Sequence, residues 1–315
     1  MIVYQYNEAS IEHPERCEDA ILVFPGGDDK APLFVVVDGM GGHQHQSANG
    51  ELVTGRDAAQ LIRNVLIEDL EHLPPDIDAS PGGLAEQRIM AALTHANERV
   101  LAELNSIEGL ASRHRVGAVL TVTVVCENGK RVLVMQVGDT RGYLYSEGEL
   151  IQLCADEDNI EYFVRERGLS EDDAARLSTV LNEYDGVHEP KAEGTIMLGG
   201  QKFDLYMAWR WFLVGNPALN IPAANIVLNA LGINENKPVP EMSRIEIAPG
   251  DVLFLCSDGL YKNLSDTEIA TGLETTSASD DTAQKLGGEA FARSQDTTNH
   301  RSYFDDISAV VVKFE

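Results

Sequence analysis

The chain is short of basic residues, and this shortage excludes several classes of partner. Lysine and arginine number 24 against 51 aspartates and glutamates, which gives a net charge of −27 over 315 residues. Because nucleic acids and anionic membranes repel so negative a protein, we expect neither as a partner. The sequence also lacks any apolar run of about 20 residues and has no secretion signal at its start. We therefore expect a cytoplasmic protein.

Several familiar motifs are missing as well. The four cysteines lie far apart and form no CxxC pair, so the sequence predicts neither a zinc ribbon nor a thioredoxin-like site. A P-loop enzyme is disfavoured because no GxxxxGK[ST] motif occurs. His43 and His45 form an HxH pair, but no third His or Cys ligand lies nearby, so we interpret them as part of a polar segment that leads into a helix.

What the sequence does contain is a series of short apolar runs. They predict strands at 20–24, 33–37, 118–126, 131–137, 142–146, 149–153, 251–256 and 307–314, and helical spacing predicts helices at 47–70, 84–104, 265–273 and 282–294. Tight turns such as Asn128-Gly129 join neighbouring strands, so hairpins are commoner than strand–helix alternation. This order favours an α+β fold with antiparallel sheets and helices outside.

The segment from about 155 to 224 differs because it is strongly acidic and comparatively poor in apolar residues. A helix is expected over 161–181, and strands over 195–198 and 203–214 are expected to pair around Gly199-Gly200. Trp209 and Trp211 would then face the same side of the second strand. We predict one domain over 1–315 in which this segment is a flap. The tryptophans either pack the flap or form a surface for a protein partner.

Acidic residues lie at the ends of many of the apolar strands. These are Glu18, Asp19, Asp38, Asp139, Asp258, Asp305 and Asp306. One such acid is usually a turn residue, but repeated placement on strands of one core predicts that the ends converge. Clustered carboxylates repel one another, and divalent cations relieve that repulsion. Oxygen ligands favour magnesium or manganese over zinc. Gly39, next to Asp38, lacks a Cβ, so its carbonyl can approach a metal and its backbone can adopt a conformation closed to other residues.

Five short motifs follow one another along the chain: Glu18-Asp19, DGMGGH at 38–43, GDTR at 138–141, SDGL at 257–260 and DDIS at 305–308. Together they resemble the metal-dependent serine/threonine protein phosphatases of the type 2C class, the PPM family, in the form typical of bacterial members. The resemblance implies a four-layer α-β-β-α sandwich of two mainly antiparallel sheets flanked by helices. It also implies phosphorylated protein substrates, which a metal-bound water dephosphorylates at serine and threonine.

The resemblance further implies a set of metal ligands, which are Glu18, Asp19, Asp38, Gly39, Asp139, Asp258 and Asp305. Asp38 would bridge two Mg²⁺ or Mn²⁺ ions, and the Gly39 carbonyl would bind one of them. Asp258 and Asp305 would hold the other ion, with Asp305 and not Asp306 as the ligand. The catalytic task of activating the attacking water is thereby assigned to Asp38, Asp258 and Asp305.

Weaker contacts are implied for the remaining acids. Glu18 and Asp19 would act mostly through metal-bound water. Asp139, together with Asp258, resembles the ligands of a third and weaker ion found in many family members. Arg141 more often supports structure by pairing with an acid than it touches substrate.

The substrate side departs from the family pattern. The family usually carries an arginine five residues before the aspartate that matches Asp19, and Pro14 stands there in this chain. Arg16 is the substitute that we expect to bind the substrate phosphate. Asn229 replaces a basic residue in the segment 225–232. Two alternatives to a protein phosphatase therefore stay open: a catalytically weak or inactive regulatory module on the same fold, and a hydrolase of small phosphorylated metabolites.

Overall fold

The computed structural model describes residues 1–40, 44–47, 49–107, 110, 114–157, 160, 163–164, 167–182, 192–214, 229–275, 281–299 and 301–315. Two five-stranded antiparallel sheets form its centre. The first sheet runs in the order β1 (Ile2–Glu8), β14 (Ile307–Lys313), β13 (Val252–Cys256), β8 (Arg141–Ser146) and β9 (Glu149–Gln152). The second runs β12 (Glu241–Glu246), β7 (Arg131–Val137), β6 (Ala118–Cys126), β3 (Leu33–Gly39) and β2 (Ala20–Phe24).

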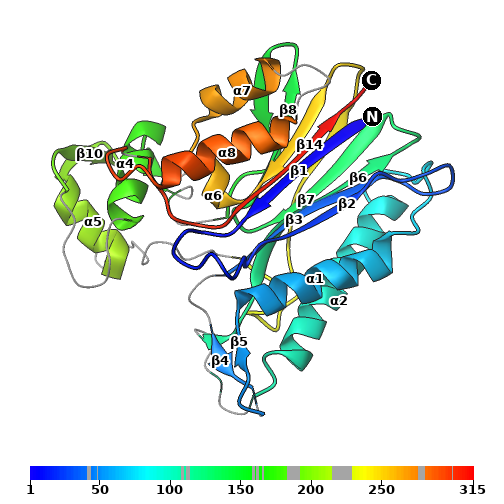
Figure 1. The fold of residues 1–315 in the computed structure, drawn as a ribbon, viewed down its shortest axis with the longest axis horizontal. Coiled ribbons are helices and arrows are strands. Elements are labelled where there is room, and N and C mark those ends of the chain that lie inside the picture. Colours follow the sequence, from blue (N-terminus) through cyan, green and yellow to red (C-terminus); the bar gives the residue numbers. More distant parts are fainter. Residues whose placement is uncertain are drawn as a thin grey trace.

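Helices cover the outer face of each sheet (Figure 1). The second sheet carries α1 (Gly55–Leu70) and α2 (Leu84–Glu103), and the first carries α7 (Asp266–Thr275) and α8 (Thr282–Ser294). A short helix, α6 (Asp258–Tyr261), follows β13. Successive residues of β3 show why its apolar run is continuous: Val35 packs towards the helices, whereas Phe34 packs between the sheets. The predicted four-layer α-β-β-α sandwich is confirmed.

The structure corrects the beginning of the first helix. It begins at Gly55 and not at residue 47, because the polar stretch before it forms the small hairpin of β4 (His45–Gln46) and β5 (Leu52–Val53). Thr54 then caps the helix, and its backbone N–H donates to the Asp57 carboxylate at 2.8 Å. The sequence did not predict two strands, β1 and β12, because both are edge strands of mixed polarity.

The described part of the insertion contains α4 (Glu171–Asn182), β10 (Thr195–Leu198), β11 (Gln201–Asp204) and α5 (Leu205–Val214). The hairpin turns at Gly199-Gly200 as expected, and both glycines have positive φ. The predicted strand over 203–214 is wrong beyond Asp204, because the chain continues as a helix. The helix expected over 161–181 includes residues 161–162 and 165–166, which lie outside the described residues. Residues 183–191 also lie outside them.

The two tryptophans do not share a strand face, since both lie on α5. Trp209 is 2% exposed within an apolar cluster confined to residues 160–209, and Trp211 packs edge-on against Phe203. The insertion projects to one side of the sandwich (Figure 1). It therefore has a small apolar core of its own. Within the described ranges, no helix has the length and apolar character needed to span a membrane.

Candidate metal centre

Strand register brings three of the acids to the same end of the second sheet, where neighbouring strands begin or finish. β2 and β3 are antiparallel, so the beginning of β2 lies beside the end of β3, and Asp19 lies close to Asp38. Asp38 itself pairs with Val119 at the beginning of β6. β7 finishes beside the same part of β6, so Asp139, two residues beyond β7, also lies at this end of the sheet.

The first sheet contributes two more acids from the ends of its strands. Asp258 follows β13 as the first residue of α6, and Asp305 lies two residues before β14. Since β13 and β14 are antiparallel neighbours, these two positions meet at one end of the pair. Gly259 makes this possible, because a Cβ there would overlap the backbone carbonyl of Asp306. The glycine after Asp258 is therefore required by close backbone packing.

The acids of the two sheets interact with one another. Burial raises the pKa of Asp38 well above its usual range, and the charges of four neighbours raise it further: Asp19, Asp258, Asp305 and Asp139. Burial and the charge of Asp258 raise the pKa of Asp305 in the same way. The site thus concentrates negative charge in a buried place, as the sequence predicted.

Two buried carboxylate oxygens of this cluster, Asp19 Oδ2 and Asp258 Oδ1, have no hydrogen-bond partner in the described part of the chain. A buried carboxylate oxygen without a partner is costly, and a cation would satisfy it. Yet no three Asp, Glu, His or Cys side chains of the described residues stand together as a ready-made ligand set. The donor chemistry therefore fits Mg²⁺ or Mn²⁺, whereas binding requires side chains to adjust.

The adjacent acids Asp305 and Asp306 have different surroundings. Asp306 accepts hydrogen bonds from the backbone N–H of Ser10 at 2.6 Å and of Glu18 at 2.5 Å. Both of its oxygens therefore hold the segment before β2 against the beginning of β14. Asp305 accepts only its neighbour's backbone N–H, at 2.8 Å, among the hydrogen bonds described.

Gly39 is crowded by backbone atoms. A Cβ at this position would lie 2.5 Å from the carbonyl oxygen of Gly55 and 2.6 Å from that of Glu18. Its φ angle is not positive, so the expected unusual backbone conformation is wrong and close packing is the reason for the glycine. Residues 41–43, including His43, lie outside the described residues. His45 lies within hydrogen-bond distance of two backbone carbonyls, those of Leu104 and His114, as a structural residue would.

Two cationic side chains adjoin the acids. Arg16 Nε lies 3.3 Å from Glu18 Oε1, and the Arg16 side chain is 31% exposed. Burial raises the pKa of Glu18, and Arg16 partly offsets that rise. Lys262 was not expected from the sequence, although its position four residues after Asp258 was a usable signal. Its Nζ lies 2.6 Å from Asp258 Oδ2.

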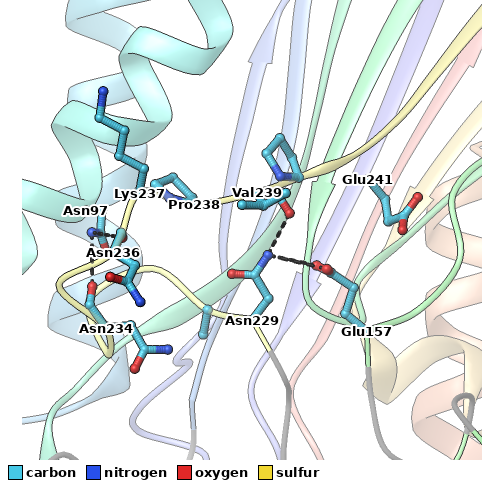
Figure 2. A pocket seen from close by; sticks show the side chains of 11 residues that line it. Asn97, Glu157, Asn229, Asn234, Asn236, Lys237, Pro238, Val239 and Glu241 are labelled. Atoms are coloured by element: carbon cyan, nitrogen blue, oxygen red, sulfur yellow. Dashed lines mark hydrogen bonds between the residues drawn. The ribbon is translucent and has the colours of Figure 1, made fainter.

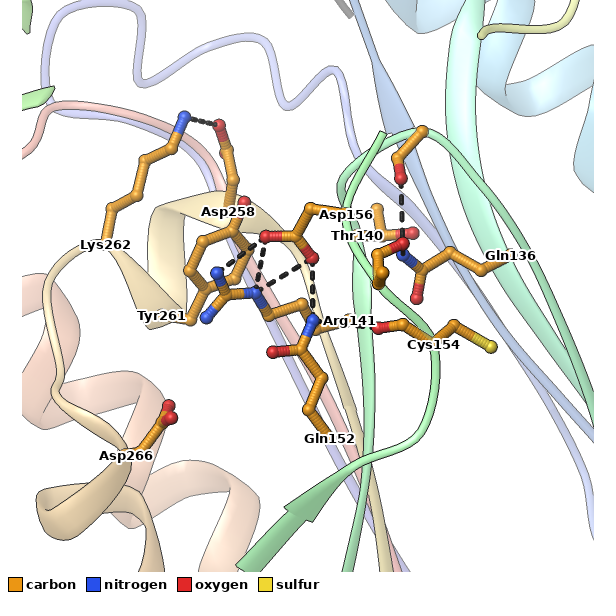
Figure 3. Close-up of polar contacts among 12 residues, drawn as sticks. Gln136, Thr140, Arg141, Gln152, Cys154, Asp156, Asp258, Tyr261, Lys262 and Asp266 are labelled. Atoms are coloured by element: carbon orange, nitrogen blue, oxygen red, sulfur yellow. Dashed lines mark hydrogen bonds and ion pairs between the residues drawn. The ribbon is translucent and has the colours of Figure 1, made fainter. Parts of the chain in front are cut away.

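Arg141 is a structural residue, as expected. Its guanidinium binds the Asp156 carboxylate through Nε and Nη2 and stacks 3.7 Å from the Tyr261 ring centroid (Figure 3). Tyr261 lies on α6 and Asp156 lies at the beginning of the insertion. Arg141 therefore joins the two segments next to Asp258.

Asn229 also has a structural partner. It lines a polar cavity of about 410 Å³ between α2 and the beginning of β12, and its amide donates to Glu157 at 3.1 Å and to the Val239 carbonyl at 2.9 Å (Figure 2). Glu157 in turn accepts the Gly138 N–H at 2.9 Å, one residue before Asp139. The amide at 229 therefore supports the loop that carries Asp139.

The comparison with known families agrees with this arrangement. Residues 8–295 match the model of the protein phosphatase 2C family. The chain belongs to this family. The fold is likewise that of solved serine/threonine phosphatases: Stp1 from Staphylococcus aureus superposes with a TM-score of 0.67 at 18% identity, covering 99% of this chain and 94% of the other.

Curated relatives of this family member are serine/threonine protein phosphatases. PstP from Mycobacterium tuberculosis is 26% identical over 276 residues, which are 87% of this chain but 39% of PstP. The phosphatase stp of Listeria monocytogenes is 24% identical over 252 residues, 80% of this chain and 75% of the relative. The PstP catalytic domain, solved in complex with two manganese ions, superposes with a TM-score of 0.61 at 22% identity. The match covers 98% of this chain and 96% of that domain. The chain thus spans about two fifths of PstP.

Proposed function

We propose that this chain removes phosphate from phosphoserine and phosphothreonine in proteins, with two Mg²⁺ or Mn²⁺ ions as cofactors. The observation that carries the proposal is the convergence of acids from both sheets, with buried carboxylate oxygens that lack partners. Membership of the protein phosphatase 2C family gives the reaction class. Ions bound there would supply a water of lowered pKa and would neutralise charge on the phosphoryl group.

Each acid has a place in this proposal. Asp38, whose acidic neighbours come from both sheets, would bridge the ions, and the Gly39 carbonyl would bind one of them. Asp258 and Asp305 would hold the other. The different surroundings of the two adjacent acids support Asp305 as the ligand, because both oxygens of Asp306 already bind backbone N–H groups.

Three other groups would act around the ions. Glu18 and Asp19 would orient metal-bound water. Arg16 would bind the substrate phosphate, since its partly exposed side chain borders the acids and an arginine can bind a phosphate with several donors. The insertion would form a flap on a single catalytic domain, and its exposed Met197 and Met207 are candidates for contact with a protein partner.

A turnover assay tests the proposal. The chain is incubated with a phosphothreonine peptide and Mn²⁺, and released phosphate is measured with and without chelator. We expect phosphate release that chelator abolishes, and Asp38→Asn should fall to the level of the chelated sample because the bridging charge is lost. Asp28→Asn, an exposed acid outside the cluster, is the matched control and should keep full activity.

One observation favours the second candidate, a weak or inactive regulatory module: Asp258 is already paired with Lys262. If wild type binds Mn²⁺ yet releases no phosphate from a broad phosphopeptide panel above the Asp38→Asn background, the phosphatase proposal is wrong and the module remains. Faster release from small sugar phosphates than from peptides would instead indicate a metabolite phosphatase.

A further inference from the structure

Lys262 lies inside the acid cluster and is held there by several contacts. Its Nζ is 2.6 Å from Asp258 Oδ2 and 3.3 Å from the Tyr303 hydroxyl, and it also lies 4.6 Å from the centroid of the Tyr303 ring. The side chain is 18% exposed. Figure 3 shows Lys262 extending from the end of α6 back to Asp258. The ammonium thus has a fixed position beside one oxygen of a proposed metal ligand.

The frame around Lys262 is itself fixed by buried hydrogen bonds. The Asn263 side chain, which is fully buried, donates to the carbonyls of Gly259 and Tyr303, both at 2.8 Å. The Tyr303 N–H donates back to Asn263 Oδ1 at 3.0 Å. Because Tyr303 is held in this way, its hydroxyl and ring keep the lysine turned towards Asp258.

A second acid acts on the same ammonium. Asp139 interacts electrostatically with Lys262, in addition to Asp258 and Tyr303. Asp139 and Asp258 are the pair to which the sequence resemblance assigns a third, weaker ion. A divalent cation held by Asp258 and Asp139 would lie close to the ammonium, whose Nζ is 2.6 Å from Asp258 Oδ2, and like charges so near each other repel strongly away from bulk water.

We propose that the Lys262 ammonium replaces the third cation of this centre, so that the protein binds two divalent ions and not three. The inference rests on the proposed two-metal centre. Asp258 would then divide its oxygens: Oδ2 binds the lysine, and Oδ1, which is buried and has no hydrogen-bond partner among the described residues, remains for a metal ion. Lys262 is thus a positioning residue that fixes the orientation of Asp258.

Counting bound Mn²⁺ by equilibrium dialysis and elemental analysis tests the inference. We expect two ions per chain in wild type at saturating Mn²⁺. Lys262→Met keeps an unbranched side chain that is only one atom shorter and removes the charge, so this variant should gain a third, weaker ion. Adding Asp139→Asn to Lys262→Met should remove that ion again. Lys262→Arg keeps the charge and should bind two, and Lys202→Met, at an exposed position on β11, is the matched control.

The inference is overturned if wild type binds three ions, or if folded Lys262→Met binds the same number as wild type. Circular dichroism establishes folding, and Lys262→Gln provides a second neutral variant if the methionine variant does not fold. Failure of the two-metal proposal gives a different result. If that proposal is wrong, wild type binds no ions that Asp38→Asn removes, whereas the Lys262 inference depends only on whether a third ion binds.

Discussion

At the scale of single residues, neighbouring acids with the same chemistry have separate tasks. Among the described hydrogen bonds Asp305 accepts only one, from its neighbour's N–H, whereas Asp306, although its charge also acts on Asp19, binds two backbone N–H groups and joins distant segments. Sequence reasoning placed both acids at the right strand end but could separate them only through the family resemblance. The partners of Asp306 lie 288 and 296 residues away in the chain, and no local pattern predicts such contacts.

Replacing Asp306 should cost stability. Asp306→Ala leaves the N–H groups of Ser10 and Glu18 without an acceptor in a buried place, so we expect the free energy of unfolding to fall by about 2 kcal/mol or more. Urea unfolding of the chelated protein at pH 7 measures this. Asp305→Asn keeps an acceptor and removes one charge from the repelling cluster, so it should raise stability under the same conditions. An unchanged midpoint for Asp306→Ala would contradict the assigned role.

At the scale of secondary-structure elements, some local signals predicted the structure correctly, whereas contacts between distant residues were not predicted. Ser265 and Glu268 have the three-residue spacing of a capping box, and the Ser265 N–H donates to Glu268 Oε2 at 2.8 Å. Arg293 of α8, which binds the same carboxylate at 2.6 Å, lies 25 residues away and was not expected. A hairpin partner was predicted over 203–214, whereas α5 forms there: Leu205, Ala208 and Trp209 follow helical spacing and are buried.

The pair of Glu268 and Arg293 gives a pH dependence. The Arg293 hydrogen bond is the largest cause that lowers the pKa of Glu268 to about 2. The Ser265 hydrogen bonds lower this pKa further, and burial opposes the shift. The folded pKa lies below the unfolded value of about 4.3, so the stabilisation is present above that value and is lost as pH falls towards about 2. The carboxylate is partly exposed, so the effect is modest and screened by salt.

Thermal unfolding of Glu268→Gln between pH 7 and pH 3 measures this dependence. We expect a lower Tm than wild type at pH 7 and a difference that shrinks as the pH falls below about 5. Glu98→Gln, an exposed acid on α2, should follow the wild-type curve throughout. A Glu268→Gln difference that stays constant with pH would show that the ionised carboxylate is not responsible.

At the scale of the whole molecule, the apolar residues fall into separate clusters. Two lie between a sheet and its helices, one lies between the sheets, and one lies within the insertion. The layers could be predicted because buried strands read as continuous apolar runs. The core of the insertion could not, because its apolar residues are dispersed among many acids and meet only after the hairpin and helices pack.

A separate core predicts separate unfolding of the insertion. Trp209 is 2% exposed, and Trp209→Ala should destabilise the insertion by about 3–5 kcal/mol through the cavity it leaves. Fluorescence of the remaining Trp211 should then report an early transition in urea, while circular dichroism of the sandwich changes at the wild-type midpoint. A common shift of both signals would mean that the insertion and the sandwich unfold as one unit.

Diffraction from crystals grown with Mn²⁺, recorded at the manganese absorption edge, tests the proposed metal centre most directly. Two-metal hydrolytic sites hold their ions about 3.5–4 Å apart. We predict two anomalous peaks at that separation, both in contact with Asp38 and the second also in contact with Asp258 and Asp305. No peak beside Asp38, or manganese held only by acids outside this cluster, would contradict the account.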